Sequence, residues 1–272
     1  MASRKEQKEQ ARATRIAKEQ QAAAQAQRAR RLQVSVAVTA LAAIVVAVAI
    51  VLSSGGSSGL KHGSAASAVY KTVNAEIGGI PQSGTTLGRP SAKVTLNYWG
   101  DLQCPICRDF TLGVGGGGLP EFIAKDVRAG IAKVHYESLC TATCNPADPT
   151  GGMGTFNVQQ SAAYSAGRQN LAWYYIELFY RQQGAEDSGY ATRKFINGIA
   201  EQIPRLNLGK WQAGVSSKVL VSQVDSSQTT GISTYKFNAT PSFTISGPKG
   251  TASLGSGILT YSELAAAVKA VS

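Results

Sequence analysis

The 272-residue sequence contains only four cysteines, and all of them lie between positions 104 and 144. So narrow a cluster excludes a small scaffold that disulfides hold together along its whole length. It indicates local chemistry instead, either redox chemistry or metal binding. With 43% hydrophobic residues, the chain is long enough to bury one core together with accessory segments.

Sequence motifs of nucleic-acid-binding proteins are also missing, although the formal net charge is +11. Residues 1–31 alone carry nine Lys or Arg and three Asp or Glu, a net charge of +6. The charge therefore marks mainly a basic tail, and we do not expect nucleic-acid binding. Because this tail lacks aromatic residues and an apolar face, we expect it to be solvated and largely disordered.

No charged residue interrupts residues 32–52, in which Val, Ala, Ile and Leu dominate. A helix of this length reaches roughly 30 Å, the thickness of the hydrocarbon core of a bilayer. The alternative is a cleaved signal peptide, but the apolar region of such a peptide usually has only about 7–15 residues. We therefore expect an uncleaved transmembrane helix.

The basic residues around this segment predict its orientation. Arg28, Arg30 and Arg31 precede it, whereas Lys61 is the only basic residue soon after it. The positive-inside rule then predicts a cytoplasmic N-terminus and an extracytoplasmic remainder in the cell membrane. The Gly- and Ser-rich residues 53–69 predict a flexible linker, in which we interpret the isolated His62 as a solvated residue.

Two cysteines follow a strand-like run within residues 94–110, VTLNYWGDLQCPICRDF. We expect a strand, a turn and a helix that begins at the cysteines, with Pro105 in its first turn. Cys104 then lies at the helix N-terminus, where unpaired N–H groups and the helix dipole favour a thiolate. Such a setting lowers a cysteine pKa from about 8.5 into the range of about 3.5–7.5. We expect Asp101 to form the turn or cap the helix; a proton acceptor is the alternative.

The remaining patterns predict an α/β domain over residues 70–272. We expect strands at 73–80, 94–99, 131–139, 242–245 and 251–254, a loop at 81–92, and helices at 108–127, 156–183, 190–203, 208–214, 215–228 and 261–271. The glycines at 115–118 should interrupt the helix in which they lie. We interpret His135, on the strand at 131–139, as a structural residue. This order places a large helical insertion at about residues 155–235.

A Cys-x-x-Cys pair between a strand and a helix is typical of a thioredoxin-like redox motif. The alternative is a zinc site in which Cys140 and Cys144 complete a set of four thiolates with Cys104 and Cys107. However, the spacing of Cys140 and Cys144 is wider than that of a tight zinc knuckle. An extracytoplasmic position also favours oxidation over metal retention, so we expect no metal.

These features together resemble the DsbA-like thioredoxin-fold thiol–disulfide oxidoreductases, and more narrowly their membrane-tethered bacterial branch. The resemblance spans about residues 70–272 and rests on the C-P-x-C motif with the later segment NATPSFTISG at 238–247. It implies that Cys104 is the nucleophile and that Cys107 resolves the mixed disulfide. It also implies that Thr240-Pro241 is a cis-proline dipeptide that faces the cysteines and pairs with an extended substrate; an edge-strand or turn proline is the alternative.

The resemblance further implies that Pro105 and Ile106 belong to the substrate-binding surface. Strongly oxidising relatives often carry histidine at the position of Ile106, so an extreme oxidising potential is not expected here. The glycine run at 115–118 and the pair Cys140 and Cys144 are two further departures. We interpret that pair as a structural disulfide; a second redox couple, free thiols and metal ligands are the alternatives.

We therefore expect a single-pass membrane protein whose extracytoplasmic domain catalyses dithiol–disulfide exchange in exported proteins, with net oxidation favoured. It needs no cofactor besides its own cysteines. The resemblance implies reoxidation by a quinone-linked membrane partner. The alternatives are a reductase or isomerase of the same fold, a non-catalytic peptide-binding or chaperone module, and a zinc-binding structural domain.

Overall fold

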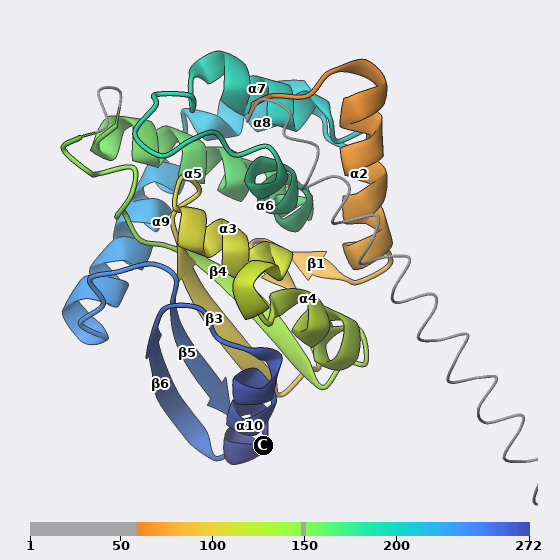
Figure 1. The fold of residues 1–272 in the computed structure, drawn as a ribbon, viewed down its shortest axis with the longest axis vertical. Helices are drawn as coiled ribbons and strands as arrows, with labels where there is room; N and C mark the ends of the chain where they lie inside the picture. Colours follow the sequence, from red (N-terminus) through yellow and green to blue (C-terminus); the bar gives the residue numbers. More distant parts are fainter. Residues whose placement is uncertain (1–58, 148–150) are drawn as a thin grey trace, which may run out of the picture. The chain divides into compact units, whose positions relative to one another are not determined.

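The computed structural model describes residues 59–147 and 151–272 (Figure 1). The predicted basic tail at 1–31, the predicted transmembrane helix at 32–52 and the first part of the predicted linker lie outside the described residues. Within the part that is described, no helix is both long enough and apolar enough to cross a lipid bilayer.

Helix α2 (Gly63–Ile77) corrects two expectations. It occupies the end of the segment predicted as a linker, and it replaces most of the strand predicted at 73–80. The β-branched residues of this stretch suggest a strand, but the spacing of the apolar residues does not. The buried side chains recur every three or four positions, which is the period of a helix; they are Ala66, Val69, Val73 and Ile77.

Six strands form one sheet in the order β1-β2-β4-β3-β5-β6. They are β1 (Gln82–Ser83), β2 (Thr86–Leu87), β3 (Val94–Gly100), β4 (Ala132–Ser138), β5 (Ser242–Gly247) and β6 (Gly250–Ser256). Strands β3 and β4 are parallel, and the other neighbouring pairs are antiparallel. The predicted strands from 94 onward are thus confirmed.

The hairpin of β1 and β2 lies in the segment that was expected to be a loop. Its two-residue turn contains Gly84 at φ +57°, a conformation that glycine adopts without strain. The strand β2 then pairs with β4 through Thr86 and Leu87.

Alternate residues of the two central strands point to opposite faces of the sheet. Tyr98 of β3 and Tyr136 of β4 are fully buried on one face. Helix α3 (Pro105–Leu112) covers this face, and its Phe110 ring lies 5.2 Å from the Tyr98 ring. On the other face, the Trp99 indole donates to the Ser227 carbonyl of α9 at 3.2 Å. The strand that leads to the cysteines is therefore held from both sides.

Short helical segments connect β3 to β4, as the glycine run predicts. They are α3, η1 (Val114–Gly116), α4 (Leu119–Phe122) and η2 (Ile123–Val127). Helix α3 ends at Gly113, which has a left-handed backbone with φ +76°. A Cβ atom on Gly118 would lie 2.3 Å from the Tyr261 nitrogen, so this close approach to the C-terminal helix requires glycine.

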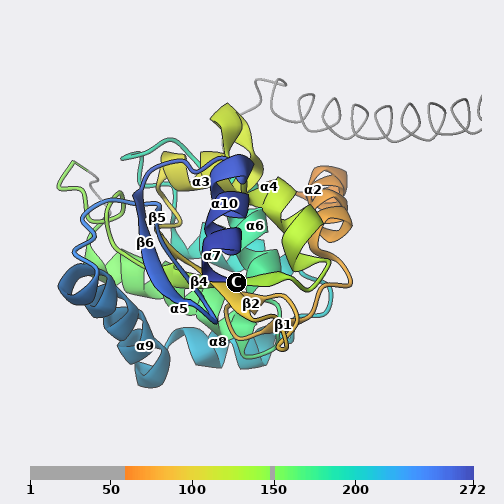
Figure 2. The same cartoon turned by 90° about the horizontal axis from the view of Figure 1, so that it is seen from below.

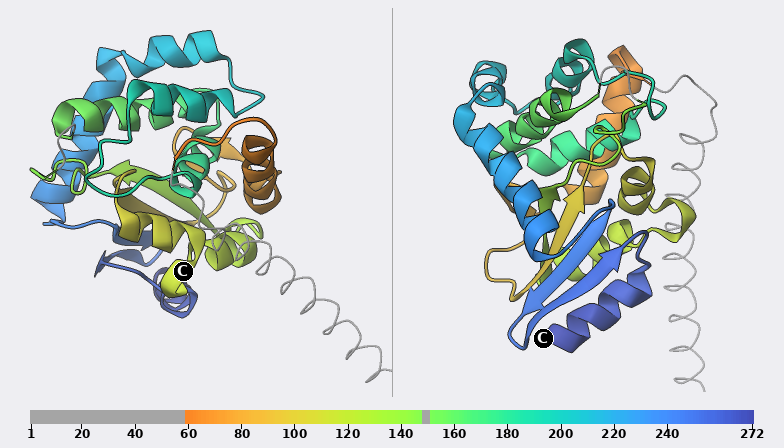
Figure 3. Two further views of the ribbon diagram at one scale, coloured as in Figure 1. Left: turned by 45° about the horizontal axis from the view of Figure 1, so that its top comes forward. Right: turned by 90° about the vertical axis from the view of Figure 1, so that its left-hand side faces the viewer.

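The helical insertion lies between β4 and β5. It comprises α5 (Met153–Gly167), α6 (Ala172–Arg181), α7 (Arg193–Glu201), α8 (Leu208–Val215), α9 (Lys218–Thr229) and η3 (Thr230–Thr234). Figures 1 and 3 show these helices gathered at one end of the sheet. The single helix predicted at 156–183 is wrong, because the chain breaks between α5 and α6, where Asn170 adopts φ +59°.

The chain ends with the β5–β6 hairpin and helix α10 (Tyr261–Val271), as predicted. Thr260 and Glu263 form a capping box at the start of α10. Figure 2 shows α10 running beside β5. The described residues therefore form an α/β domain with a large helical insertion, which is the predicted fold class.

Candidate active site

Cys104 is the N-cap residue of α3, at the end of the turn that follows β3. Its backbone is extended, and its sulfur accepts a hydrogen bond from the Cys107 N–H at 3.4 Å. Pro105 is in the first turn of the helix, where the backbone N–H that proline lacks would have no acceptor within the helix. The structure thus places the first sulfur at the positive end of a helix, as the sequence predicts.

The two cysteine thiols differ strongly in their surroundings, and neither is in a disulfide. Cys104 is 5% exposed, whereas Cys107 is fully buried. A hydrogen bond with Cys107 lowers the pKa of Cys104 below its ordinary value, while burial opposes this; the Thr240 side chain and the Cys107 N–H lower it further. Burial raises the pKa of Cys107 well above its ordinary value. The pair therefore favours a thiolate at Cys104 and a neutral thiol at Cys107.

The segment before β5 completes the site from the other end of the chain. The peptide bond between Thr240 and Pro241 is cis. The Cys104 thiol donates to the Thr240 carbonyl at 3.4 Å. Cys104, Cys107 and Thr240-Pro241 are therefore neighbours, as the resemblance implies.

An exposed apolar side chain follows Cys104 by two residues in the chain. Ile106 is 43% exposed. Together with the half-buried Pro105 it offers an uncharged surface next to the less buried of the two sulfurs.

Asp101 forms the predicted turn, because its Oδ1 accepts from the Gln103 N–H at 3.0 Å. It does not cap α3, since that position belongs to Cys104. The carboxylate is fully buried and also accepts from Thr141 and Thr143 of the loop that follows β4. Burial raises the pKa of Asp101, and these hydrogen bonds oppose the rise.

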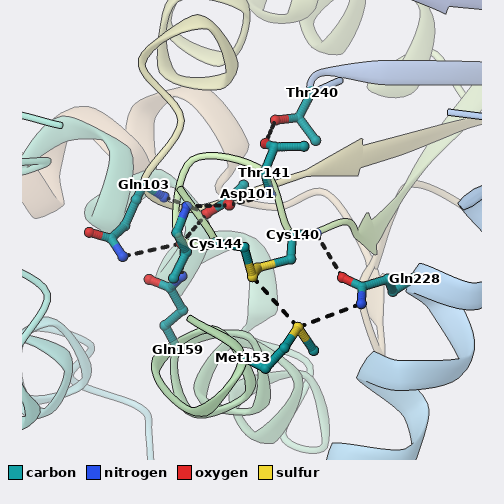
Figure 4. The surroundings of a disulfide bond; sticks show 10 residues. Asp101, Gln103, Cys140, Thr141, Cys144, Met153, Gln159, Gln228 and Thr240 are labelled. Carbon is teal, nitrogen blue, oxygen red and sulfur yellow. Dashed lines mark hydrogen bonds between the residues drawn. A yellow bond between two sulfur atoms is a disulfide. The ribbon is translucent and has the colours of Figure 1, made fainter. Parts of the chain in front are cut away.

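Cys140 and Cys144 form a disulfide with a Cα–Cα distance of 5.7 Å. It closes a loop of residues 140–144 between β4 and α5, which we call the disulfide loop. Figure 4 shows this loop next to Asp101 and Thr240, and the hydroxyl groups of Thr141 and Thr240 are hydrogen-bonded to each other. The disulfide loop therefore contacts Asp101 and Thr240, and the Thr240 carbonyl in turn contacts the Cys104 thiol.

Three glutamines of the helical insertion belong to the site and were not revealed by the sequence. Gln228 of α9 accepts from the Cys140 N–H at 2.9 Å, and Gln159 of α5 donates to the Thr143 hydroxyl at 2.5 Å. Gln183, just after α6, donates to the carbonyls of Leu102 and Cys104. The only sequence signal for these contacts is the polar, threonine-rich composition of the disulfide loop.

The zinc alternative finds no support in the structure. The disulfide occupies two of the four sulfurs that a tetrahedral site would need. Across residues 59–147 and 151–272, no group of three or more His, Cys, Asp or Glu side chains is arranged to hold a metal ion.

His135 lies on the opposite side of β4 from Tyr136, away from the face that α3 covers. Its Nδ1 hydrogen-bonds to the Thr86 hydroxyl at 2.7 Å, and its Nε2 lies 3.2 Å from the Glu137 carboxylate. These contacts connect β4 to the β1–β2 hairpin and agree with the structural interpretation. The second histidine, His62, immediately precedes α2.

Comparisons with known proteins agree with the observed fold. Residues 82–270 match the protein family described as thioredoxin. No protein of curated function matches the chain in sequence.

Solved structures share the fold at low sequence identity. Oxidised BdbD from Bacillus subtilis superposes with a TM-score of 0.55 at 15% identity, covering 70% of this chain and 96% of its own. A thioredoxin-like oxidoreductase from Silicibacter pomeroyi gives 0.51 at 20% identity, covering 68% and 90%. MdbA, a thiol-disulfide oxidoreductase from Corynebacterium matruchotii, gives 0.52 at 15% identity, covering 67% and 91%. The domain therefore has a thioredoxin-like fold with a helical insertion.

Proposed function

Since this chain belongs to the thioredoxin family, we propose that it is a thiol–disulfide oxidoreductase whose exchanging sulfurs are Cys104 and Cys107. The observation that carries the proposal is the asymmetry of the pair beside Thr240-Pro241. One sulfur is an N-cap residue with a lowered pKa, and the other is buried with a raised pKa. Known oxidoreductases among the structures of the same fold support the same class of chemistry.

The oxidising reaction begins with a disulfide between the two cysteines. A substrate thiolate attacks the Cys104 sulfur, a mixed disulfide forms, and Cys107 leaves and takes up a proton. The raised pKa of Cys107 favours this protonation. A second substrate thiolate then attacks the substrate sulfur of the mixed disulfide and expels Cys104 as a thiolate. The substrate loses two electrons and gains a disulfide, and the enzyme is left with two thiols.

The lowered pKa of Cys104 supports oxidation as the net direction. A thiol of low pKa is a better leaving group, and a stabilised thiolate also stabilises the reduced form of the enzyme. The reduced enzyme must pass its two electrons to another oxidant. We propose a quinone-linked membrane protein for this step, on the resemblance alone.

We place the substrate along the surface formed by Pro105, Ile106 and the Thr240-Pro241 segment. The uncharged, exposed Ile106 suits unfolded polypeptides of varied sequence. Backbone pairing with the segment before β5 would select an extended chain and not a particular side chain. Exported proteins with unpaired cysteines fit both conditions.

We further propose that residues 32–52 anchor the protein in the membrane with the domain outside the cytoplasm. The apolar run and the preceding arginines support this placement. The half-buried Cys140–Cys144 disulfide supports it as well, because disulfides persist mainly in oxidising compartments. The domain boundaries that we propose are 32–52 for the anchor, about 53–62 for the linker, and 63 onward for the catalytic domain.

Trapping tests the proposed function. A Cys107→Ala chain in cells should accumulate disulfide-linked adducts with exported proteins, since the mixed disulfide at Cys104 can no longer be resolved internally. The double variant Cys104→Ser with Cys107→Ala is the matched control and should form none. If both chains give the same adducts, or if Cys104→Ser alone retains full activity, the protein is a binding module and not an oxidoreductase.

A reductase or isomerase of the same fold is the competing assignment. Equilibration of the cysteine pair against glutathione distinguishes this assignment from an oxidase, because the reduction potentials of thioredoxin-fold enzymes span roughly −270 to −120 mV. A potential near the lower end would favour reduction.

A further inference from the structure

Thr141 connects the disulfide loop to the segment that contacts the Cys104 sulfur. Its hydroxyl is hydrogen-bonded to the Thr240 hydroxyl. The carbonyl of the same Thr240 accepts the Cys104 thiol at 3.4 Å. Thr141 therefore contacts Thr240 directly, and Thr240 contacts the Cys104 thiol.

Asp101 fixes the backbone of Thr141 from the opposite side. Its Oδ2 accepts from the Thr141 N–H at 3.0 Å and from the Thr143 N–H at 2.8 Å. Its Oδ1 accepts from the Gln103 N–H and from the Thr143 hydroxyl at 2.5 Å. Four donors thus converge on one buried carboxylate, which lies in the turn between β3 and Cys104.

The disulfide closes the loop around these threonines. Only three residues separate Cys140 from Cys144, so the bond restricts the backbone that carries Thr141 and Thr143. Gln228 of α9 holds the Cys140 N–H, and the Met153 sulfur lies 3.6 Å from the Cys144 sulfur (Figure 4). The loop is thereby fastened to the helical insertion on one side and to the redox site on the other.

We propose that Thr141 is a positioning residue for Cys104, acting through the Thr240 side chain, and that the Cys140–Cys144 disulfide holds Thr141 in place. The second cysteine pair then controls the reactivity of the first without exchanging electrons with it. The proposal rests on the proposed function only in taking Cys104 as the reactive sulfur.

The chemistry follows from the position of Thr240. Its side chain is one of the groups that stabilise the Cys104 thiolate, and its carbonyl accepts the thiol. With the Thr141 contact, the Thr240 side chain keeps one orientation beside both sulfurs. Without it, the side chain rotates among several positions, and the thiolate loses part of its stabilisation.

The test measures iodoacetamide alkylation of Cys104 against pH in the full-length chain. A Cys107→Ser background leaves Cys104 as the one free thiol, and the serine hydroxyl keeps a donor at position 107. In this background, Thr141→Val removes the hydroxyl at nearly constant shape. We expect the pH midpoint to rise by about 0.4–1 and the rate at pH 7 to fall about three- to tenfold, the effect of one hydrogen bond. Thr141→Ser should restore both values.

Two further variants separate positioning from mere folding. Thr251→Val is the matched control, since Thr251 is exposed on β6 away from the site, and it should leave the midpoint unchanged. Cys140→Ser with Cys144→Ser removes the disulfide and should raise the midpoint as Thr141→Val does. Thr141→Val combined with Cys140→Ser and Cys144→Ser should raise the midpoint no further than either change alone, because the disulfide acts through Thr141. If the disulfide-free chain does not fold, Thr141→Val and Thr141→Ser still decide the question.

Three results would overturn the proposal. The first is an unchanged alkylation midpoint in Thr141→Val. The second is a loss of thermal stability without a change in midpoint when the disulfide is removed, which would make the bond purely structural. The third is additive effects of the two changes. If Cys104 alkylates like an ordinary cysteine before any of these substitutions, the proposed function fails instead, so the two failures can be told apart.

Discussion

The Cys104 sulfur lies 3.4 Å from the carbonyl oxygen of Thr240, a residue 136 positions later in the chain. The helical insertion occupies most of that interval, yet the sheet returns the chain to the site because β5 pairs with β3. The reactive sulfur therefore has a helix N-terminus on one side and the cis Thr240-Pro241 segment on the other. Several measurable properties follow from this position.

The first is the pH dependence of Cys104 itself. Hydrogen bonding with Cys107 lowers the pKa of Cys104, and the thiolate is the form that alkylates. In the reduced wild-type chain, alkylation of Cys104 should therefore reach half its maximal rate below pH 8.5, the value of about 8.5 being that of an unperturbed cysteine. Cys107 should stay unlabelled over the same pH range, because its thiol is buried and its pKa is raised. Stopped-flow alkylation with peptide mass analysis distinguishes the two sites, and a half-maximal rate at or above pH 8.5 would contradict the assignment.

The second concerns Ile106. Its side chain is 43% exposed, so a histidine at this position remains hydrated and can take up a proton. Ile106→His should stabilise the nearby thiolate, most strongly below pH 6.5 or so, where histidine is largely charged. We expect the equilibrium with glutathione to shift about tenfold toward the reduced enzyme, which corresponds to about 30 mV more oxidising. Ile106→Asn is polar but uncharged and should shift it much less; an equal shift in both variants would exclude a charge effect.

The third concerns the buried carboxylate of Asp101. Asp101→Asn keeps the shape of the side chain but replaces one carboxylate oxygen with an NH2 group. This group cannot accept hydrogen bonds from the N–H donors of the turn and the disulfide loop. We expect a loss of about 2–6 kcal/mol in the free energy of unfolding, since two buried donors lose their acceptor at about 1–3 kcal/mol each. Urea unfolding at pH 7 measures it. Asp225→Asn on the exposed side of α9 is the control and should change stability by less than about 0.5 kcal/mol. A similarly small change in Asp101→Asn would show that the carboxylate does not hold the loop.

The central strands and the C-terminal end of the domain could be predicted from local patterns. Strand β3 shows the alternation of apolar and polar residues, and the motif from Cys104 to Cys107 follows directly after a turn. Thr260 and Glu263 are three residues apart, the spacing of a capping box, and mark the start of α10. Such signals depend on residues that are neighbours in sequence, so they can be read without knowledge of the tertiary structure.

Other elements required information that composition does not contain. The β-branched residues at 73–80 favour a strand, but Val73 and Ile77 are four apart and pack as one face of α2. The break between α5 and α6 depends on the left-handed backbone of Asn170, which no apolar pattern reveals. In each case tertiary packing outweighs local propensity.

The site was predictable only in part for the same reason. Cys104 and Cys107 carry their own motif, but Thr141 and Gln183 reach the site from distant positions in the chain. Their hydrogen bonds involve ordinary polar side chains at no recognisable spacing. Only the folded chain shows that the loop between Cys140 and Cys144 contacts Asp101 and Thr240, which lie next to Cys104.

The fourth property is the pH dependence of stability through Glu177. This residue of α6 is almost fully buried, and burial raises its pKa to about 8 although the Arg181 guanidinium lies 3.5 Å away. Arg181 also forms an ion pair with Glu76 of α2, so it does not serve Glu177 alone. In the unfolded chain the pKa of a glutamate is about 4.3. Glu177 should therefore be protonated in the folded protein at neutral pH.

The sign of the effect follows from these two pKa values. Between pH 4.3 or so and pH 8, the unfolded chain releases the proton while the folded chain keeps it, so the stability from Glu177 is complete below this window and declines as the pH rises through it. Glu177→Gln cannot ionise and should lack this part of the decline. Urea unfolding at pH 5 and pH 8 should show the variant gaining on the wild type as the pH rises, whereas Glu201→Gln, exposed on α7, should follow the wild type. If Glu177→Gln and the wild type lose stability in parallel, Glu177 is ionised in the folded protein, and Arg181 outweighs its burial.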